Sequence, residues 1–237
     1  MARQRLERPL LAAALILAAS IAVATAQDQD APQPSPSAVL FEATSHRKFD
    51  QVEQWTRVFD DPARDAWQKP GAVIAALQIA PGAVVADVGA GTGYFVRHLA
   101  AAVGPEGTVL AVETEPNMLT HLRERAEREH LSNVVPVLAS FDNPRLPTGR
   151  VDLVLFVDTL HHVDARLTYL RRLQGALTPT GRVAVIDWLK RDIPVGPKHD
   201  HKLPRQQIVT EMKAAGYRLV DAPDVLPYQY FLVFAPR

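Results

Sequence analysis

The chain has 237 residues, which is enough for one globular domain with a terminal extension. Its 26 basic residues balance 26 acidic residues, and this balance argues against a dedicated nucleic-acid-binding protein, which carries a basic excess or stripe. The sequence contains no cysteine, so disulfide bonds, thiolate metal sites and cysteine nucleophiles are excluded.

The first 26 residues have the three parts of an export signal. A basic start is followed by an apolar run over 10–24 and by the small-residue pattern Ala24-Thr25-Ala26. The run is short and alanine-rich for a stable membrane span. We therefore expect a signal peptide over 1–26, cleaved after Ala26, and a periplasmic or secreted protein. The alternative is a protein anchored in the membrane by the uncleaved signal.

The residues after the signal separate into a linker and a domain. Residues 27–40 are mostly polar and contain three prolines, a composition that predicts a disordered linker. Mixed aromatic and charged residues over 41–68 predict short helices that pack on the main domain, and 70–77 predicts one further helix.

Strand and helix patterns alternate along the rest of the chain, and this alternation predicts a mostly parallel sheet with right-handed crossovers. Two closing strands without a long helix between them predict an antiparallel hairpin at one edge. The predicted strands are 83–88, 108–112, 134–138, 151–157, 182–186, 217–220 and 229–234. The predicted helices are 94–103, 116–130, 164–177 (with Asp164 as its cap) and 204–215.

A glycine-rich loop, Gly89-Ala90-Gly91-Thr92-Gly93, follows the first predicted strand of the alternating region. Such a loop lets the backbone approach a nucleotide, and the next helix offers unpaired N–H groups. The G-x-G-x-G spacing differs from the dinucleotide pattern G-x-G-x-x-G, whose third glycine would fall at Tyr94, and no Gly-Lys-Ser/Thr follows as in a P-loop. The alternative is a tight structural turn.

An acidic residue, Glu113, ends the second strand. A carboxylate at this position can accept hydrogen bonds from both hydroxyls of an unphosphorylated ribose. The alternative is a solvated carboxylate at a strand end, which the glycine-rich loop on the preceding unit makes a weaker interpretation.

Four segments, VVADVGAGTG, AVETEP, VDLVLFVDTLHH and LTPTGRVAVIDW, resemble successive motifs of class I S-adenosylmethionine-dependent methyltransferases. The resemblance runs from about Trp67 to the C-terminus. RDAWQKP, PVGPKHDHKLP and LPYQYFLVF resemble a bacterial subgroup that carries signal peptides, and quinone-biosynthesis methyltransferases are similar more distantly. Together with the short helices predicted over 41–68, the resemblance predicts a methyltransferase domain over 41–237 with an N-terminal helical cap. It also implies a single-domain, doubly wound α/β, Rossmann-like fold whose seven strands follow the order 3-2-1-4-5-7-6, with strand 7 antiparallel.

The resemblance also implies the residues that bind S-adenosylmethionine. Asp87 and the loop residues Gly89, Ala90, Gly91 and Gly93 would form the wall for its methionine part. Glu113 would hold the ribose, and Asp158 would lie near the amino group and the reacting methyl group.

The adenine end departs from the family pattern. The family often has an acidic residue at the end of strand three, where this chain reads Ala139-Ser140-Phe141-Asp142. Asp142 or the hydroxyl of Ser140 would replace that contact, and Phe141 would pack on the adenine.

Two histidine pairs are candidates for a catalytic base, which is needed only if the acceptor must lose a proton. His161 and His162 follow Asp158 at a strand end where open α/β sheets bind ligands. We expect the two side chains to point in opposite directions, as on an extended segment, so that only one of them matters. His199 and His201 are equally well explained as polar loop residues. The spacing fits no metal site of a known kind.

Three functions remain open from the sequence. The first is a methyltransferase acting on a small-molecule acceptor, with quinone-like compounds among the candidates. The second is a non-catalytic module that binds S-adenosylmethionine or another nucleoside, and the third is a different nucleoside-using enzyme on the same fold. Export would place the protein where S-adenosylmethionine is not expected to be plentiful.

Overall fold

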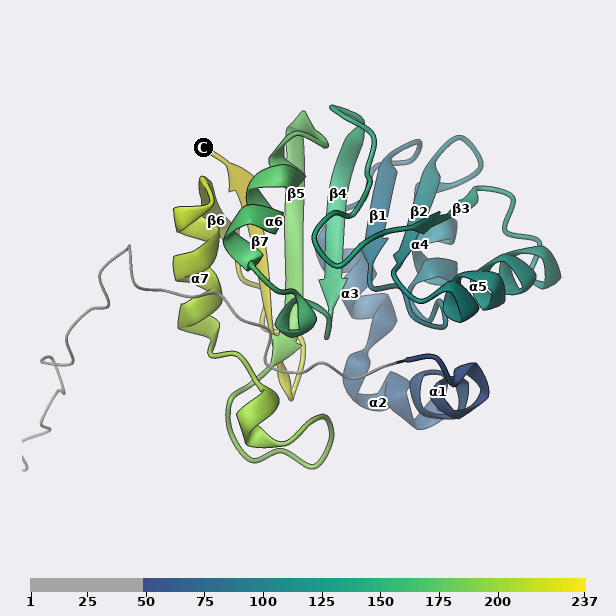
Figure 1. Cartoon of the computed structure of the whole chain (residues 1–237), viewed down its shortest axis with the longest axis horizontal. Coiled ribbons are helices and arrows are strands. Elements are labelled where there is room, and N and C mark those ends of the chain that lie inside the picture. The colour runs from purple at the N-terminus through teal and green to yellow at the C-terminus, as the bar shows by residue number, and fades with distance from the viewer. Residues whose placement is uncertain (1–48) are drawn as a thin grey trace, which may run out of the picture. The chain divides into compact units, whose positions relative to one another are not determined.

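The computed structural model describes residues 49–237 (Figure 1). The predicted signal peptide, the linker and residues 41–48 of the predicted cap lie outside the described residues. Within the described part, no helix combines the length and the apolar character that a membrane crossing needs.

The core is a seven-stranded sheet in the order β3-β2-β1-β4-β5-β7-β6, which confirms the predicted topology. β7 pairs antiparallel with both β5 and β6, whereas the other pairings are parallel. The strands are β1 (Val84–Val88), β2 (Thr108–Glu113), β3 (Val134–Leu138), β4 (Val151–Val157), β5 (Leu177–Trp188), β6 (Tyr217–Asp221) and β7 (Gln229–Pro236).

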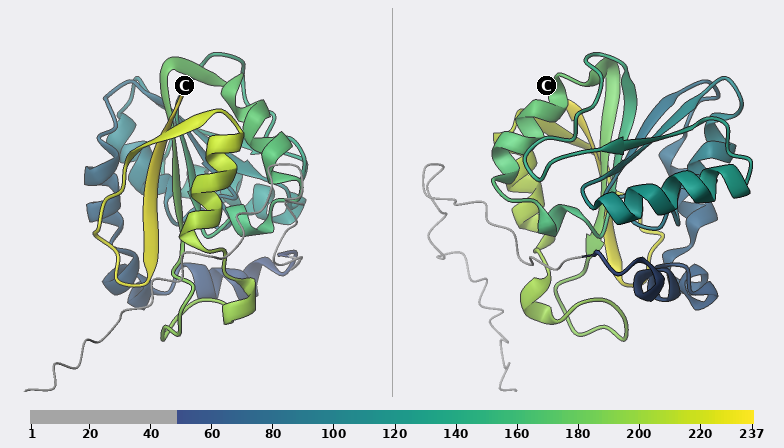
Figure 2. Two further views of the ribbon diagram at one scale, coloured as in Figure 1. Left: turned by 90° about the vertical axis from the view of Figure 1, so that its left-hand side faces the viewer. Right: turned by 45° about the vertical axis from the view of Figure 1, so that its right-hand side comes forward.

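Helices cover both faces of the sheet (Figures 1 and 2). Apolar side chains of α3, α4 and α5 pack in one core cluster, and those of α6 and α7 pack in a second cluster across the sheet. The central strands are therefore buried on both faces, which explains their nearly continuous apolar sequences. The helices are α3 (Pro70–Leu77), α4 (Val96–Val103), α5 (Pro116–Arg128), α6 (Arg166–Gln174) and α7 (Arg205–Ala214).

Several predicted boundaries were wrong by a few residues. α4 begins at Val96 rather than at 94, because the turn that follows the glycine-rich loop continues through Phe95. α6 begins at Arg166, and Ala165 rather than Asp164 precedes it in the cap position. β5 is longer than predicted because Leu177 already pairs with β4.

The two helices on the second face are joined by a buried ion pair. Nε of Arg166 on α6 lies 2.7 Å from Oε2 of Glu211 on α7, and Nη2 donates to Oε1 at 3.2 Å. Both side chains are about 1% exposed. Nε2 of Gln207 donates a further hydrogen bond to the same carboxylate at 2.8 Å.

Three short helices precede α3, and we call residues 49–68 the cap. They are α1 (Val52–Phe59), η1 (Pro62–Arg64) and α2 (Asp65–Gln68). In Figures 1 and 2 the cap lies at the carboxyl ends of the parallel strands. Asp60 of the cap contacts the main domain, because its carboxylate accepts hydrogen bonds from Thr92 Oγ1 at 3.0 Å and from Arg125 Nη1 at 2.8 Å.

Candidate active site

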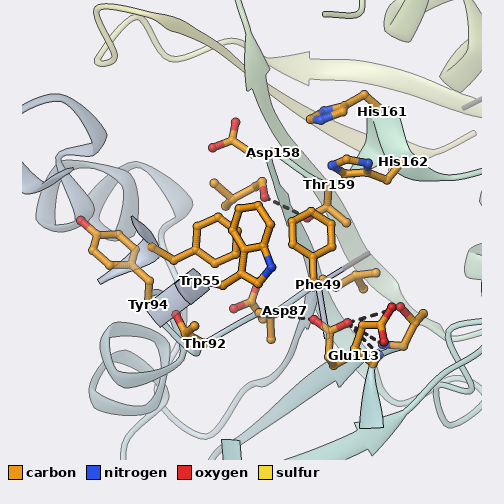
Figure 3. A pocket seen from close by; sticks show the side chains of 18 of the residues that line it. Phe49, Trp55, Asp87, Thr92, Tyr94, Glu113, Asp158, Thr159, His161 and His162 are labelled. Atoms are coloured by element: carbon orange, nitrogen blue, oxygen red, sulfur yellow. Dashed lines mark hydrogen bonds between the residues drawn. The ribbon is translucent and has the colours of Figure 1, made fainter. Parts of the chain in front are cut away.

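A cavity of about 690 Å³ lies at the carboxyl ends of β1, β2, β4 and β5. The cap covers one side of it, and the loop between β5 and α7 (residues 189–204) contributes Gly196, Pro197, Lys198 and His201 to the other side. Figure 3 shows Asp158 and two histidines toward one end of this cavity and Glu113 toward the other. The cavity occupies the edge at which open α/β sheets bind ligands.

The glycine-rich loop forms the floor of the cavity through Gly89, Ala90 and Gly91. Gly89 has φ 76°, and a Cβ atom there would lie 2.3 Å from Cγ2 of Thr159. Any side chain at this position would therefore collide with the turn after β4. Gly91 also has a left-handed backbone, with φ 56°.

Gly93 does not line the cavity. A Cβ atom on Gly93 would lie 2.9 Å from Cδ2 of Leu122, so this glycine allows the loop to pack closely against α5. We therefore assign Gly93 to packing rather than to direct contact with a ligand.

Glu113 lies in the cavity wall and fixes the shape of the loop. Its Oε2 accepts a hydrogen bond from the N–H of Gly91 at 2.9 Å, and its Oε1 accepts from the N–H groups of Thr114 at 2.6 Å and Glu115 at 3.2 Å. Three N–H donors on one carboxylate fix its orientation. Glu113 therefore holds the glycine-rich loop and also lines the cavity.

Two carboxyl groups, those of Asp87 and Asp158, line the cavity. Burial raises the pKa of Asp87 to about 7, against the opposing effect of Arg64. Burial and the nearby Asp187 carboxylate raise the pKa of Asp158 to about 7. Bringing a cation between such groups would restore their charge, because an opposite charge favours the ionised form.

Asp158 also has an unusual backbone. Its φ of 54° places it in the left-handed region, which non-glycine residues seldom adopt and which often marks a functional site. Its Oδ1 accepts a hydrogen bond from Nε2 of Gln229 at 2.7 Å.

Arg64 places a guanidinium in the same cavity, and the sequence motifs gave no sign of it. Its Cζ lies 4.0 Å from the centroid of the Tyr94 ring, and its Nη1 donates to the carbonyl oxygen of Phe59 at 3.0 Å. The cavity thus combines Asp87 and Asp158 with a cation. That combination suits an amino-acid group with one ammonium, one carboxylate and a neighbouring positive charge.

Of the three residues predicted to contact the adenine, two line the cavity and one does not. Ser140 and Phe141 line the cavity, and Phe141 is 67% exposed. Asp142 does not line it; its carboxylate accepts from Arg172 Nη1 at 2.8 Å and from Ser140 Oγ at 2.8 Å. Of the two proposed replacements for the family's acidic residue, only Ser140 therefore lies at the cavity.

Aromatic rings of the cap complete the cover over the cavity. The ring of Trp55 lies 4.8 Å from that of Phe49 and 5.2 Å from that of Phe59, measured between centroids. Trp67 of the cap lies 5.3 Å from Trp188 at the end of β5. These rings provide an apolar surface on which flat groups can stack.

His161 and His162 both line the cavity, so the expectation that they point in opposite directions was wrong. They lie in a 3-10 turn (η2, Leu160–His162) rather than on an extended segment, and their ring centroids are 4.2 Å apart. Nδ1 of His161 lies 3.0 Å from both carboxylate oxygens of Asp187. Burial lowers the pKa of His161, but Asp187 outweighs this effect and raises it above its usual value.

The second histidine pair is split. His201 lines the cavity, whereas His199 does not, and its side chain is 52% exposed. Within the described residues, no group of three or more acidic or histidine side chains is arranged to hold a metal ion.

The sheet order and the site at its carboxyl edge define the fold of class I methyltransferases. Residues 85–181 match the family described as a methyltransferase domain, and together with the fold this match supports a class I S-adenosylmethionine-dependent methyltransferase. The cavity residues fit S-adenosylmethionine, the cofactor of this class, through paired carboxylates, a guanidinium and the glycine-rich loop.

Curated relatives support this identification. A demethylmenaquinone methyltransferase of Listeria welshimeri is 26% identical over 157 residues, which cover 65% of this chain and 66% of the relative. A ubiquinone/menaquinone biosynthesis C-methyltransferase of Ectopseudomonas mendocina is 30% identical over 118 residues, 49% of this chain and 46% of the relative. The chain thus spans just under two thirds of the length of the Listeria relatives.

A solved structure shows the same fold. An S-adenosylmethionine-dependent methyltransferase from Aquifex aeolicus superposes with a TM-score of 0.74 at 24% identity, covering 80% of this chain and 98% of that one.

Proposed function

We propose that this chain transfers the methyl group of S-adenosylmethionine to a small aromatic acceptor that carries an acidic hydroxyl group. The observation that supports this proposal is the buried His161–Asp187 pair, which faces the same cavity as Asp87 and Asp158. A cofactor site alone would need no paired histidine, whereas an acceptor that must lose a proton does.

The residues of the cofactor side act by position and charge. When bound, S-adenosylmethionine supplies an electrophilic methyl group on a positively charged sulfur. Asp87 and Asp158 would hold its cationic groups, Arg64 its carboxylate and Glu113 its ribose. Methyl transfer is an in-line displacement, so fixed geometry and fixed charges supply most of the catalysis.

His161 would accept the proton of the acceptor's hydroxyl group. The carboxylate of Asp187 accepts the Nδ1 proton, which leaves Nε2 as the basic nitrogen of the neutral ring. As the proton moves to Nε2, the imidazolium gains the buried Asp187 carboxylate as a counter-charge. The acceptor oxygen is thereby made nucleophilic.

An aromatic acceptor is supported by aromatic side chains in the cavity wall. Trp67, Tyr169 and Trp188 line the cavity, and the last of these directly follows Asp187. The relatives described above are named for menaquinone and ubiquinone biosynthesis, which suggests quinol-like compounds as the first acceptors to test.

Calorimetry with S-adenosylmethionine, S-adenosylhomocysteine and NAD tests the cofactor, and a panel of phenols and hydroquinones tests turnover. We expect both adenosyl compounds to bind, NAD to bind weakly or not at all, and methylated product to form. NAD binding equal to or tighter than that of S-adenosylmethionine would reject the proposal. Cofactor binding without turnover on any acceptor would favour a non-catalytic binding module.

We further propose that the chain is exported and that its signal is removed after Ala26, which would place it in the bacterial subgroup with signal peptides. The supporting observation is the pattern of the first 26 residues. N-terminal sequencing of protein from a periplasmic fraction should begin at Gln27. Recovery of the intact N-terminus in the membrane fraction would favour an uncleaved anchor.

A further inference from the structure

A chain of hydrogen bonds connects the cap to the end of β4. Nε and Nη2 of Arg64 donate to Oε1 of Gln68 at 3.3 and 3.1 Å. Nε2 of Gln68 donates to Oε1 of Gln229 at 2.9 Å, and Nε2 of Gln229 donates to Oδ1 of Asp158 at 2.7 Å.

The direction of every bond in this chain is fixed by its two ends. A guanidinium can only donate hydrogen bonds, so Gln68 must turn its oxygen toward Arg64 and its NH₂ group toward Gln229. Gln229 must then accept through its oxygen and donate through its NH₂ group. The carboxyl group of Asp158, at the end of the chain, accepts the last hydrogen bond. Because the ionised carboxylate is the better acceptor, this bond favours the ionised form of Asp158.

The two amides are buried deeply enough for this orientation to matter. Gln68 is 0% exposed and Gln229 is 4% exposed. A buried amide that loses its partners carries a substantial free-energy cost, so neither glutamine is free to turn around.

We propose that Gln68 and Gln229 are positioning residues, and we call the hydrogen bonds from Arg64 through these two amides to Asp158 the relay. Through the relay, packing of the cap against the domain orients Asp158 to accept the cationic end of the cofactor. This inference rests on the proposed cofactor site. It assigns a role to residues from α2 and β7 that contact Asp158 directly or through one intermediate. Gln68 itself does not contact Asp158, so its effect on Asp158 passes through Gln229 or through Arg64, to which it is also hydrogen-bonded.

Several charged or ionisable groups surround Asp158 and act with the relay. Arg64 on η1 and His161 on η2 favour its ionised form, whereas Asp187 on β5 disfavours it. Tyr230 on β7 is also coupled to it electrostatically. The hydrogen bond from Gln229 lowers the pKa of Asp158 and thus opposes burial.

The relay predicts how the pH dependence of cofactor binding changes in variants. Protonated Asp158 cannot attract a cation, so affinity for S-adenosylmethionine should rise as the pH increases through the range in which Asp158 ionises. Gln229→Met removes the donor and should move this rise upward by about one pH unit, the shift that matches one hydrogen bond to a charged group. Gln68→Met should move it in the same direction by a smaller amount.

The experiment is calorimetric titration with S-adenosylmethionine at several pH values between about 5.5 and 8.5, bracketing the shifted carboxylates. The matched control is Gln207→Leu, which removes a glutamine-to-carboxylate hydrogen bond of 2.8 Å outside the cavity. Its pH profile should equal that of the wild type. Asp87 is outside the relay, so its own titration should contribute equally in every variant.

Methionine has nearly the volume of glutamine, so the variants are expected to fold, and thermal melting checks this. If Gln68→Met does not fold, Gln68→Asn breaks the same bond by shortening the donor arm. A pH profile of folded Gln68→Met or Gln68→Asn identical to the wild type would overturn the relay. Absence of S-adenosylmethionine binding by the wild type at every pH would instead reject the proposed function.

Discussion

Nδ1 of His161 is equidistant, at 3.0 Å, from the two carboxylate oxygens of Asp187. Asp187 is fully buried, and its Oδ1 also accepts a hydrogen bond from the N–H of Trp188 at 2.8 Å. The carboxylate is therefore held from two sides and in turn holds the imidazole ring. This arrangement fixes the tautomer of His161 before any acceptor arrives.

His161→Ala should lower turnover by roughly 100-fold or more, the usual scale for loss of a general base. Affinity for S-adenosylmethionine should change little, because the proposed contacts to the ribose and the methionine part are made by other residues. The measurement is turnover and cofactor affinity in His161→Ala and, for comparison, His162→Ala. Wild-type turnover in both variants would show that the acceptor needs no base from this turn.

The rate should also depend on pH in a defined direction. Asp187 raises the pKa of His161, and only neutral His161 can accept a proton, so turnover should fall as the pH drops below this raised value. Asp187→Asn removes the stabilising charge and should move the acidic limb of the profile to lower pH. If the acidic limb of the profile lies at the same pH in the wild type and in Asp187→Asn, the limb reports an ionisable group other than His161.

Gly91→Val should abolish cofactor binding in a folded protein. The new side chain would fill space over the glycine-rich loop, where an added Cβ would lie 3.5 Å from Cδ2 of Phe59. The matched control is Gly104→Val, because Gly104 has a similar φ of 70° with nothing within 4 Å of its Cβ. Both variants carry backbone strain, so loss of binding in both would mean that strain rather than obstruction is responsible.

Asp87→Asn should make the cofactor-free protein more stable at pH 8. The folded pKa of Asp87 is about 7, whereas an unfolded aspartate titrates near 3.9. Between these values the folded state binds more protons, so this group's contribution to stability falls as the pH rises. Asparagine cannot ionise, and the gain should be on the order of 2–4 kcal/mol at pH 8 and close to zero near pH 4. Urea unfolding of both proteins at pH 8 and pH 4 measures this change in the free energy of unfolding. An equal change at the two pH values would contradict a raised pKa for Asp87.

Glu211→Ala should destabilise the fold strongly without touching the cavity. It would leave the guanidinium of Arg166, 1% exposed, without its carboxylate partner, and breaking a buried pair in this way costs about 3–5 kcal/mol. The comparison is Asp142→Ala, which breaks the exposed pair with Arg172 and should change stability little. Similar unfolding midpoints for the two variants would show that the buried pair contributes no more to stability than the exposed pair.

The strands and the mostly parallel sheet were predictable because each parallel strand is a short apolar run between helical segments, whereas the order of the strands came from the resemblance to class I methyltransferases. The glycine-rich loop and Glu113 were predictable for a related reason: their spacing is local, and their hydrogen bonds join neighbouring units of the fold. The same reasoning gave the wrong orientation for His161 and His162, since nothing in that short segment signals a 3-10 turn.

Arg64, Gln68 and Gln229 could not be found from local patterns, because their roles come from contacts between distant parts of the chain. Gln68 and Gln229 are 161 residues apart in sequence. Asp187 left one signal, since it is an acidic residue within the otherwise apolar run VAVIDW. A buried carboxylate at that position needs a partner, but the sequence did not identify His161 as that partner.

The bond between Gln68 and Gln229 has a consequence for how the protein is made. β7 is made after the other six strands of the sheet, and until it pairs with β5 the cap has no anchor at Gln229. In a nascent chain the glycine-rich loop is therefore made well before β7, which is needed to hold the cap over the cavity. We expect cofactor uptake to follow the synthesis of β7, so that truncation before β7 removes ligand binding even where the first four strands still fold.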